Sequence, residues 1–306
     1  EPFEHVGGWK QGIRLPVMEI NPSTAAENQE YRVEGMKSGI YVGFKTRKDQ
    51  VKLMKVAISY TGVDEAMNNL MTELPGWDFD AVAKSSANEW DQWLSRIDVQ
   101  GGTITEQRRF YTDLYHALQG RRIVSDVSGA YIDNTGTAPL KRIVPLDDKG
   151  KPQFRMYNSD SWWGAQWSLN TLWHLVYPEV TEDFIRSMLK MYDDGGLIPR
   201  GPSGGNYTYV MTGATTTPFI ASAWLKGIRG FDMNKAYEGM RKDHFPGGMM
   251  SKAGYEHKTF KGGGIEEYME LGYIPHPLHP IKYGYHQDGA AQTLEYAYQD
   301  FALAQL

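Results

Sequence analysis

The hydrophobic pattern of the chain changes its period near Thr61. Before this point, apolar and polar residues alternate through 39–45 and again through 51–60, and the charged stretch 45–50 connects them. This alternation predicts an antiparallel pair of strands with one buried face. Because two or three strands alone are only marginally stable, we expect this pair to be the end of a larger sheet.

After Thr61 the apolar residues recur at helical spacing. Acidic residues in the first turn favour a helix that begins at Val63, and Thr103 with Glu106 forms a candidate capping box. Arg121–Tyr157 is rich in Gly, Asp, Asn and Pro and predicts loops. Further helices are expected at 79–94, 103–116, 163–175, 182–192, 216–228, 234–242 and 290–306.

Loops rich in glycine and aromatic residues, such as 195–206 and 262–286, separate these helices. The fold class is therefore mainly α, and we expect an α/α toroid whose site is built from loops at one end. The expected helices are too few to close a toroid. The last helix runs to Leu306 without a terminating glycine or proline, so we expect the chain to stop partway through this architecture.

Composition excludes several classes of protein. The 306 residues contain no cysteine, which rules out a disulfide scaffold, a thiolate metal site and a cysteine nucleophile. A net charge of −5, with 32 basic residues dispersed among 37 acidic ones, argues against binding nucleic acid. No stretch approaches the roughly 20 apolar residues of a membrane span. The chain begins at Glu1 without an initiator Met, so we expect a processed or partial chain.

Glycine and aromatic residues are in surplus, with 33 Gly, 9 Trp and 19 Tyr. Trp and Tyr combine an apolar ring face with a polar group, which suits stacking against sugar rings. The composition is thus compatible with a carbohydrate-handling enzyme, and a large aromatic core is the alternative interpretation.

The densest group of such residues is the segment Tyr157–Trp167, at a junction between a loop and a helix. We interpret Trp162, Trp163 and Gln166 as a sugar-binding platform, with the Asp160 carboxylate accepting hydrogen bonds from hydroxyls. The alternative is that Asp160 or Ser161 serves as a helix N-cap.

A second candidate is the glycine-rich loop Gly195–Thr208, in which Arg200 and Asn206 offer donors to hydroxyls or to a carboxylate. It lacks the GxxxxGK[ST] pattern of a phosphate loop. A purely structural loop is the alternative. His116, at the end of an apolar helix, is a third candidate for the loop end of the toroid, and a structural histidine is the alternative.

Other patterns point to chemistry less directly. Glu266 and Glu270 share a helix face and suggest the paired carboxylates of a glycosidase, but we favour a solvated acidic face. His276 and His279 suggest a metal site, which the intervening prolines and the absence of an HExxH motif disfavour. No GxSxG motif occurs, which disfavours an α/β-hydrolase.

Several motifs, taken in order, resemble glycoside hydrolase family 92, the calcium-dependent exo-acting α-mannosidases. Each motif is weak alone, but together they cover nearly the whole chain from about Lys37 onward. They are Gly62–Leu70, Pro75–Asp80, Trp90–Leu94, Phe110–His116, Ser125-Asp126, Gly129–Tyr131, Asn206–Thr208, Val210-Met211, Lys226–Asp232, Gly272–Pro275 and Thr293–Ala297.

The resemblance implies the end of an N-terminal β-sandwich at 1–61, a helical linker at 62–98 and the first part of an (α/α)6 catalytic barrel at 99–306. It also implies a secreted or periplasmic location and an inverting mechanism, in which an acid and a base lie about 6.5–9.5 Å apart. Calcium would bind sugar hydroxyls through oxygen ligands. The family's catalytic carboxylates and most of its calcium ligands have no counterpart in this chain, so we expect either that a second chain segment completes the barrel or that this chain is inactive alone.

Four positions depart from the family pattern. Gly164 stands where the family has an acid, and Trp167 stands where it has an arginine. Ala214 and Thr215 also replace the usual Asp-His pair after the Asn-Tyr-Thr segment. Such losses remove hydrogen bonds that select a sugar.

We therefore expect an α-mannosidase-type hydrolase that acts on terminal α-linked mannose or a related sugar of a glycan. Two alternatives stay open: a non-catalytic glycan-binding protein on the same scaffold, and another α/α-toroid enzyme such as a polysaccharide lyase. The residues assigned to the substrate pocket are Trp162, Trp163, Gln166, Arg200, Asn206, His116 and Asp160.

Overall fold

The computed structural model divides the chain into two compact units, Glu1–Met54 and Lys55–Leu306. The predicted division at 61 and 98 stays a prediction, because the contacts do not separate a linker from a catalytic part. The structure describes residues 5–16, 18–19, 31–159, 162–252, 263–278 and 289–306.

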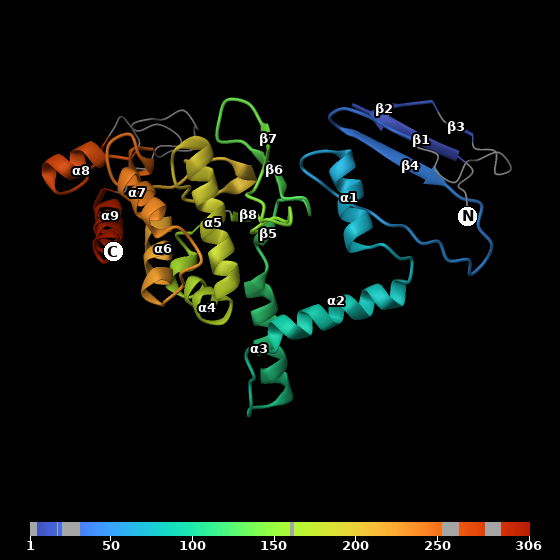
Figure 1. Cartoon of the computed structure of the whole chain (residues 1–306), viewed down its shortest axis with the longest axis horizontal. Helices are drawn as coiled ribbons and strands as arrows, with labels where there is room; N and C mark the ends of the chain where they lie inside the picture. Colours follow the sequence, from blue (N-terminus) through green and yellow to red (C-terminus); the bar gives the residue numbers. More distant parts are fainter. Residues whose placement is uncertain (1–4, 17, 20–30, 160–161, 253–262, 279–288) are drawn as a thin grey trace. The chain divides into compact units, whose positions relative to one another are not determined.

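The first unit is built around strand β1 (Figure 1). β1 pairs antiparallel with each of the other three strands, and Val6 opposite Val42 fixes its register against β4. Gly7 makes this pairing possible, because a Cβ there would lie 2.3 Å from the Tyr41 ring. The strands are β1 (His5–Lys10), β2 (Ile13–Arg14), β3 (Met18–Glu19) and β4 (Ser38–Gly43).

The predicted pairing of 39–45 with 51–60 is wrong, since β4 pairs with β1. The segment 51–60 has no assigned strand, and alternating apolar side chains along it, such as Met54 and Ile58, are exposed. Alternation shows that a segment can form a strand, but it carries no information about which backbone will supply the hydrogen bonds.

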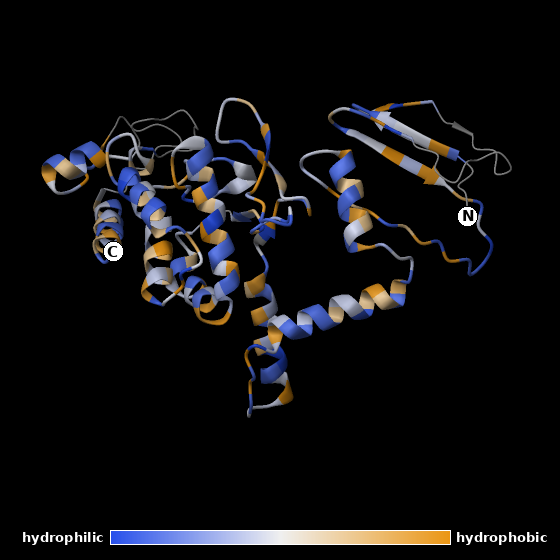
Figure 2. Ribbon diagram, viewed as in Figure 1, coloured by the Kyte–Doolittle hydropathy of each residue, from blue (hydrophilic) through white to orange (hydrophobic). Residues whose placement is uncertain are grey.

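The second unit is mainly helical (Figure 1). Its helices are α1 (Val63–Glu73), α2 (Phe79–Leu94), α3 (Ile104–Leu118), α4 (Leu169–Val176), α5 (Pro178–Gly195), α6 (Thr216–Leu225), α7 (Met233–Asp243), α8 (Ile265–Leu271) and α9 (Gly289–Ala304), with short 3-10 turns η1 (Ala165–Trp167), η2 (Ser203–Gly205) and η3 (Met249–Ser251). Figure 2 shows that α5 carries both hydrophilic and hydrophobic residues. The mainly helical fold class is confirmed.

Local signals explain where several helices begin and end. The predicted capping box at α3 is present, since Thr103 and Glu106 exchange side-chain and backbone hydrogen bonds. Asp78 caps α2 by accepting from the Ala81 backbone N–H at 2.9 Å. Gly196 ends α5 in the left-handed region at φ 84°, which glycine adopts at little cost.

The stretch 121–157, predicted as loops, instead contributes to two short pairs of antiparallel strands. β5 (Arg121–Ile123) pairs with β8 (Tyr157–Ser159), and β6 (Ala130–Asp133) pairs with β7 (Leu140–Ile143). Turn residues dominate this stretch, and its strands are only three or four residues long, too short to produce a clear alternation.

The largest core cluster is aromatic and joins α4, α5, α6 and α7. Its centre is Phe184 on α5, which contacts the rings of Tyr157, Trp162 and Trp173 at centroid distances of 4.8, 5.7 and 5.2 Å. A second cluster packs the β6–β7 hairpin against the end of α5 through Tyr131 and Met191. Much of the aromatic surplus therefore lies in the core.

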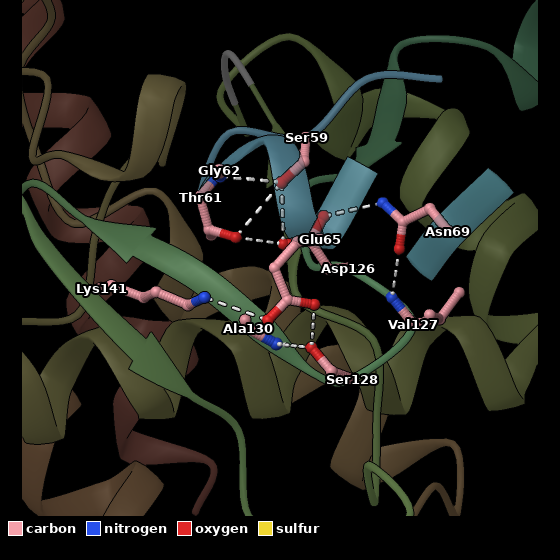
Figure 3. A network of polar contacts seen from close by, with 10 residues as sticks. All are labelled: Ser59, Thr61, Gly62, Glu65, Asn69, Asp126, Val127, Ser128, Ala130 and Lys141. Atoms are coloured by element: carbon pink, nitrogen blue, oxygen red, sulfur yellow. Dashed lines mark hydrogen bonds and ion pairs between the residues drawn. The ribbon is translucent and has the colours of Figure 1, made fainter. Parts of the chain in front are cut away.

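Helices α1 and α2 lie in the predicted linker region 62–98, and they are less buried than the helices of the core clusters. No residue of α1 or α2 is fully buried. A polar network holds α1 to the turn before β6 (Figure 3). In the part of the chain that the structure describes, no helix is long and apolar enough to cross a membrane.

Candidate functional site

The two segments predicted to form the site lie in neighbouring elements. β8, which precedes Trp162, packs against η2 in the glycine-rich loop. Asn134 fixes this loop, since its backbone N–H donates to Gly205 O at 3.0 Å and its Nδ2 donates to Gly204 O at 2.6 Å. A Cβ on Gly205 would lie 2.6 Å from Ile132 O, so only glycine lets the loop backbone approach β6 this closely.

A ladder of polar side chains runs along η1 and α4. Asn170 and His174 are four residues apart on α4 and share one face of that helix, whereas Gln166 lies in η1, which the non-helical Ser168 at φ −150° separates from α4. Asn170 and His174 are 4% and 3% exposed. Gln166 Oε1, both amide atoms of Asn170 and both ring nitrogens of His174 are buried without a hydrogen-bond partner among the described residues.

Unpartnered buried polar atoms are unusual, because each carries a desolvation cost of about 1–3 kcal/mol. At functional sites such atoms are often left for a ligand or a water molecule. Gln166 was among the predicted site residues, whereas Asn170 and His174 were not. The four-residue spacing of Asn170 and His174 was the signal that sequence reasoning missed.

His174 is held neutral by its surroundings. Burial, with a smaller contribution from Lys226, lowers the pKa of its imidazole from 6.5 to about 4. Its ring lies 4.7 Å from that of Phe219. A neutral imidazole has one donor and one acceptor nitrogen, so His174 can bind a hydroxyl as either partner.

The predicted tryptophan platform is split by the fold. Trp162 is 1% exposed and packs against Phe219 at 4.3 Å, so both its ring faces belong to the core rather than to a surface. Trp163 is half-buried, and Trp167 is 80% exposed. Adjacent tryptophans looked alike in sequence, but a turn directs them to different environments. Asp160 lies outside the described residues.

Arg200 is fully buried rather than facing a pocket. Its Nη2 donates to the carbonyl oxygens of Met249 and Lys252, both at 2.6 Å, which ties the glycine-rich loop to η3. Burial lowers the pKa of its guanidinium to about 10, so it stays charged at neutral pH. Its Nε and Nη1 have no partner among the described residues.

Asp243 on α7 is 1% exposed, and its electrostatic contribution, like that of Tyr296, favours the charged form of Arg200 without a direct ion pair among the described residues. Burial raises the pKa of the Asp243 carboxyl well above its ordinary value, although the backbone N–H groups of Met249 and Ile198 donate to it. A raised carboxyl pKa is typical of a general acid. The complete burial of Asp243 within loop-to-helix contacts favours a structural role.

The remaining candidates occupy separate places. Asn206 is half-buried, and its Oδ1, like that of Asn158 on β8, lacks a partner among the described residues. His116 is exposed at the end of α3, with its ring 5.5 Å from that of Tyr115. We use the name candidate site for the amide and imidazole side chains whose buried polar atoms lack a partner among the described residues, namely Asn158, Gln166, Asn170, His174 and Asn206.

This set is chemically uniform. It consists of neutral amides and one neutral imidazole, which bind hydroxyl groups but do not supply an acid and base pair. Glu266 and Glu270 are exposed on α8, as expected for a solvated face. In the residues that the structure describes, no three His, Asp or Glu side chains gather to hold a metal ion, and His279 lies outside them.

Comparisons with known proteins agree with the fold. Residues 65–306 match the family model for the glycosyl hydrolase family 92 catalytic domain. An uncharacterized secreted glycosidase of Arthroderma benhamiae is 22% identical over 294 residues, which is 93% of this chain and 32% of that protein.

Solved structures of the same family are also similar. A family GH92 inverting mannosidase of Bacteroides thetaiotaomicron has a TM-score of 0.72 at 22% identity, over 99% of this chain and 36% of that one. A GH92 α-mannosidase of the same species has a TM-score of 0.70 at 24% identity, over 98% and 36%. The chain thus spans about a third of the length of these relatives and shares their fold over that part.

Proposed function

Because the chain belongs to glycosyl hydrolase family 92, we propose that the protein is an exo-acting, inverting α-mannosidase-type hydrolase. It removes terminal α-linked mannose, or a related sugar, from a glycan. Its substrate pocket includes the amides and imidazole of the candidate site, as hydroxyl-binding groups.

The unpartnered polar side chains of η1 and α4 are the observation that carries this proposal for the chain itself. Gln166, Asn170 and His174 expose no charge and leave donors and acceptors without partners among the described residues. A site that binds hydroxyls strongly rejects analogues that lack them, since its own polar groups are then left unpaired. A sugar, with a hydroxyl on nearly every carbon, fits such a set of groups.

The acid and base of the reaction belong, in this proposal, to parts of the protein other than the candidate site. The described residues offer no carboxylate pair there. We propose that the whole protein requires calcium for activity. The described residues provide no group of ligands that could hold the ion.

A secreted or periplasmic location also belongs to the proposal. It rests on the similarity to a fungal protein described as a secreted glycosidase. A glycan is the proposed partner, and the acidic net charge of −5 disfavours nucleic acid.

The test is release of free monosaccharide from aryl α-D-mannopyranosides and α-linked mannobiose by the full-length protein. We expect Asn170→Leu and His174→Leu to reduce kcat/KM by tenfold or more, and Trp167→Leu to change it little. If the full-length protein binds these sugars but releases none, the hydrolase proposal is wrong.

That outcome would favour a second function, a non-catalytic glycan-binding protein. Gly164, Trp167, Ala214 and Thr215 support this alternative, because each occupies a position where the family pattern has a polar group for sugar contact. Binding on a glycan array without any hydrolysis would establish it.

A further inference from the structure

A cavity outside the candidate site has an aromatic lining. It has a volume of about 300 Å³ and lies between α2 and the body formed by β8, α4 and α5. Trp90 and Trp93 of α2 form one side, and Tyr157 and Trp173 form another. Its volume is at the small end of the range of about 300–1,000 Å³ for ligand pockets.

The rings of this cavity are fixed by their neighbours. Trp90 packs against Tyr115 at a centroid distance of 4.5 Å, and Trp93 packs against Tyr177 at 5.5 Å. The Tyr177 hydroxyl also donates to the Trp93 carbonyl oxygen at 3.0 Å, which anchors the end of α2 beside the cavity. Walls held in this way lose little conformational entropy when a ligand binds.

Polar groups accompany the rings. Ser86 and Glu89 are exposed lining residues on α2. Trp173 is 4% exposed, and its Nε1–H has no hydrogen-bond partner among the described residues. Burial raises the pKa of Tyr157 to about 12, so its hydroxyl remains protonated at neutral pH.

This combination fits a neutral sugar better than an apolar group. A pyranose ring presents C–H groups to an aromatic face and hydroxyls around its edge, which need donors and acceptors. A purely apolar occupant would desolvate Glu89 without compensation. The same carboxylate repels anionic sugars such as uronic acids.

The cavity is separate from the candidate site. Neighbouring residues of a strand point to opposite faces, so Tyr157 faces the cavity while Asn158 of the candidate site points away from it. On α4, Trp173 lines the cavity, whereas the next residue, His174, lies on a different side of the helix.

We propose that this cavity, walled by Trp90, Trp93, Tyr157 and Trp173 with Glu89 and Ser86 beside them, is a second binding site for one neutral pyranose residue of a glycan. It binds without catalysing a reaction. The inference does not depend on hydrolysis at the candidate site.

The test is titration of the full-length protein with methyl α-D-mannopyranoside and methyl β-D-glucopyranoside, followed by tryptophan fluorescence and saturation-transfer NMR. Trp90→Ala removes a wall, and Ser86→Trp fills the cavity from its exposed side. We expect each variant to raise the Kd of this site about tenfold or more. Trp167→Ala is the matched control, because Trp167 is exposed away from the cavity lining, and it should bind like the parent.

The two proposals fail separately. In a Gln166→Ala/Asn206→Ala background, binding in the cavity should persist, and Ser86→Trp should leave the rate of monosaccharide release unchanged. Circular dichroism serves to confirm that Trp90→Ala and Ser86→Trp fold like the parent. The cavity proposal is overturned if these folded variants bind both pyranosides with the Kd of the parent. Absence of pyranoside binding by the parent, or equal binding of sodium glucuronate, overturns it as well.

Discussion

At the scale of single residues, His174 shows how burial sets the pH dependence of stability. The unfolded chain binds a proton at His174 below pH 6.5, whereas the folded chain binds it only below about pH 4. Folding stability from this residue is therefore complete above pH 6.5 and is lost as the pH falls to 4. The loss amounts to roughly 3 kcal/mol.

We expect His174→Leu to remove that part of the pH dependence. At pH 7 the variant should be about as stable as the parent, because the replaced ring nitrogens lack partners among the described residues. Urea unfolding at pH 7 and pH 4.5 measures this. An identical loss of stability in parent and variant between these two pH values would contradict the assignment.

Arg200 is a buried charge that is held by backbone carbonyl groups. Arg200→Met removes a donor from the carbonyl oxygens of Met249 and Lys252, and it removes a positive charge that favours the Asp243 carboxylate. Loss of such buried hydrogen bonds costs about 1–3 kcal/mol. A double-mutant cycle with Asp243→Asn should show that the two losses are not additive. Additive losses would mean that the two charges do not interact.

These residues also show what the sequence can predict of a site. The segments around Trp162 and Arg200 are dense in polar and aromatic residues, and their assignment to a substrate pocket stays a prediction. Whether a given side chain faces ligand or core depends on its direction from the backbone, and Trp162 and Arg200 both turned inward. His174 and Asn170 were overlooked because they lie within an apolar helix.

At the scale of elements, α1 depends on a polar network instead of a buried face. Asp126, which is 6% exposed, accepts from Ser59 Oγ at 3.0 Å, Asn69 Nδ2 at 2.8 Å and the Thr61 hydroxyl (Figure 3). Asn69 Oδ1 also accepts from the Val127 backbone N–H at 2.9 Å. Beside this group, Glu65 accepts from Ser128 Oγ at 2.8 Å and Lys141 Nζ at 3.0 Å.

Asp126→Ala should therefore release α1 selectively, because α1 has no fully buried residue to hold it. We expect faster hydrogen exchange of amides in Val63–Glu73, with exchange in α5 unchanged, as measured by mass spectrometry. Ser128→Ala is the matched control, since it removes only one bond of Glu65 and should have a smaller effect. Unchanged exchange in α1 would show that the network is not its anchor.

Elements with local signals were predictable, and elements that depend on distant partners were not. α2 begins and ends where its pattern predicts, at Phe79 and Leu94, and α3 has its predicted capping box. The partner of β4 is β1, which lies about 30 residues earlier in the chain, so no local pattern could identify it.

At the scale of the whole molecule, the fold class and the family follow from the order of weak motifs. The chain spans about a third of the length of the relatives that it matches. Its described residues include buried neutral amides and an imidazole without partners among them, and they offer no cluster of metal ligands.

Metal removal tests the part of the proposal that depends on calcium. We expect a calcium-specific chelator to abolish monosaccharide release by the full-length protein and added Ca²⁺ to restore it. The fold of residues 65–306 should survive chelation, since its described residues provide no metal site. Unchanged activity after thorough chelation would remove calcium from the account.

The most direct test of the central claim is the anomeric form of the first product. Proton NMR can follow an aryl α-D-mannopyranoside while the full-length protein hydrolyses it, before mutarotation mixes the anomers. An inverting exo-acting α-mannosidase releases β-mannose first, and this is the expected result. Initial release of α-mannose would contradict the inverting mechanism, and no release of mannose would contradict the proposed function.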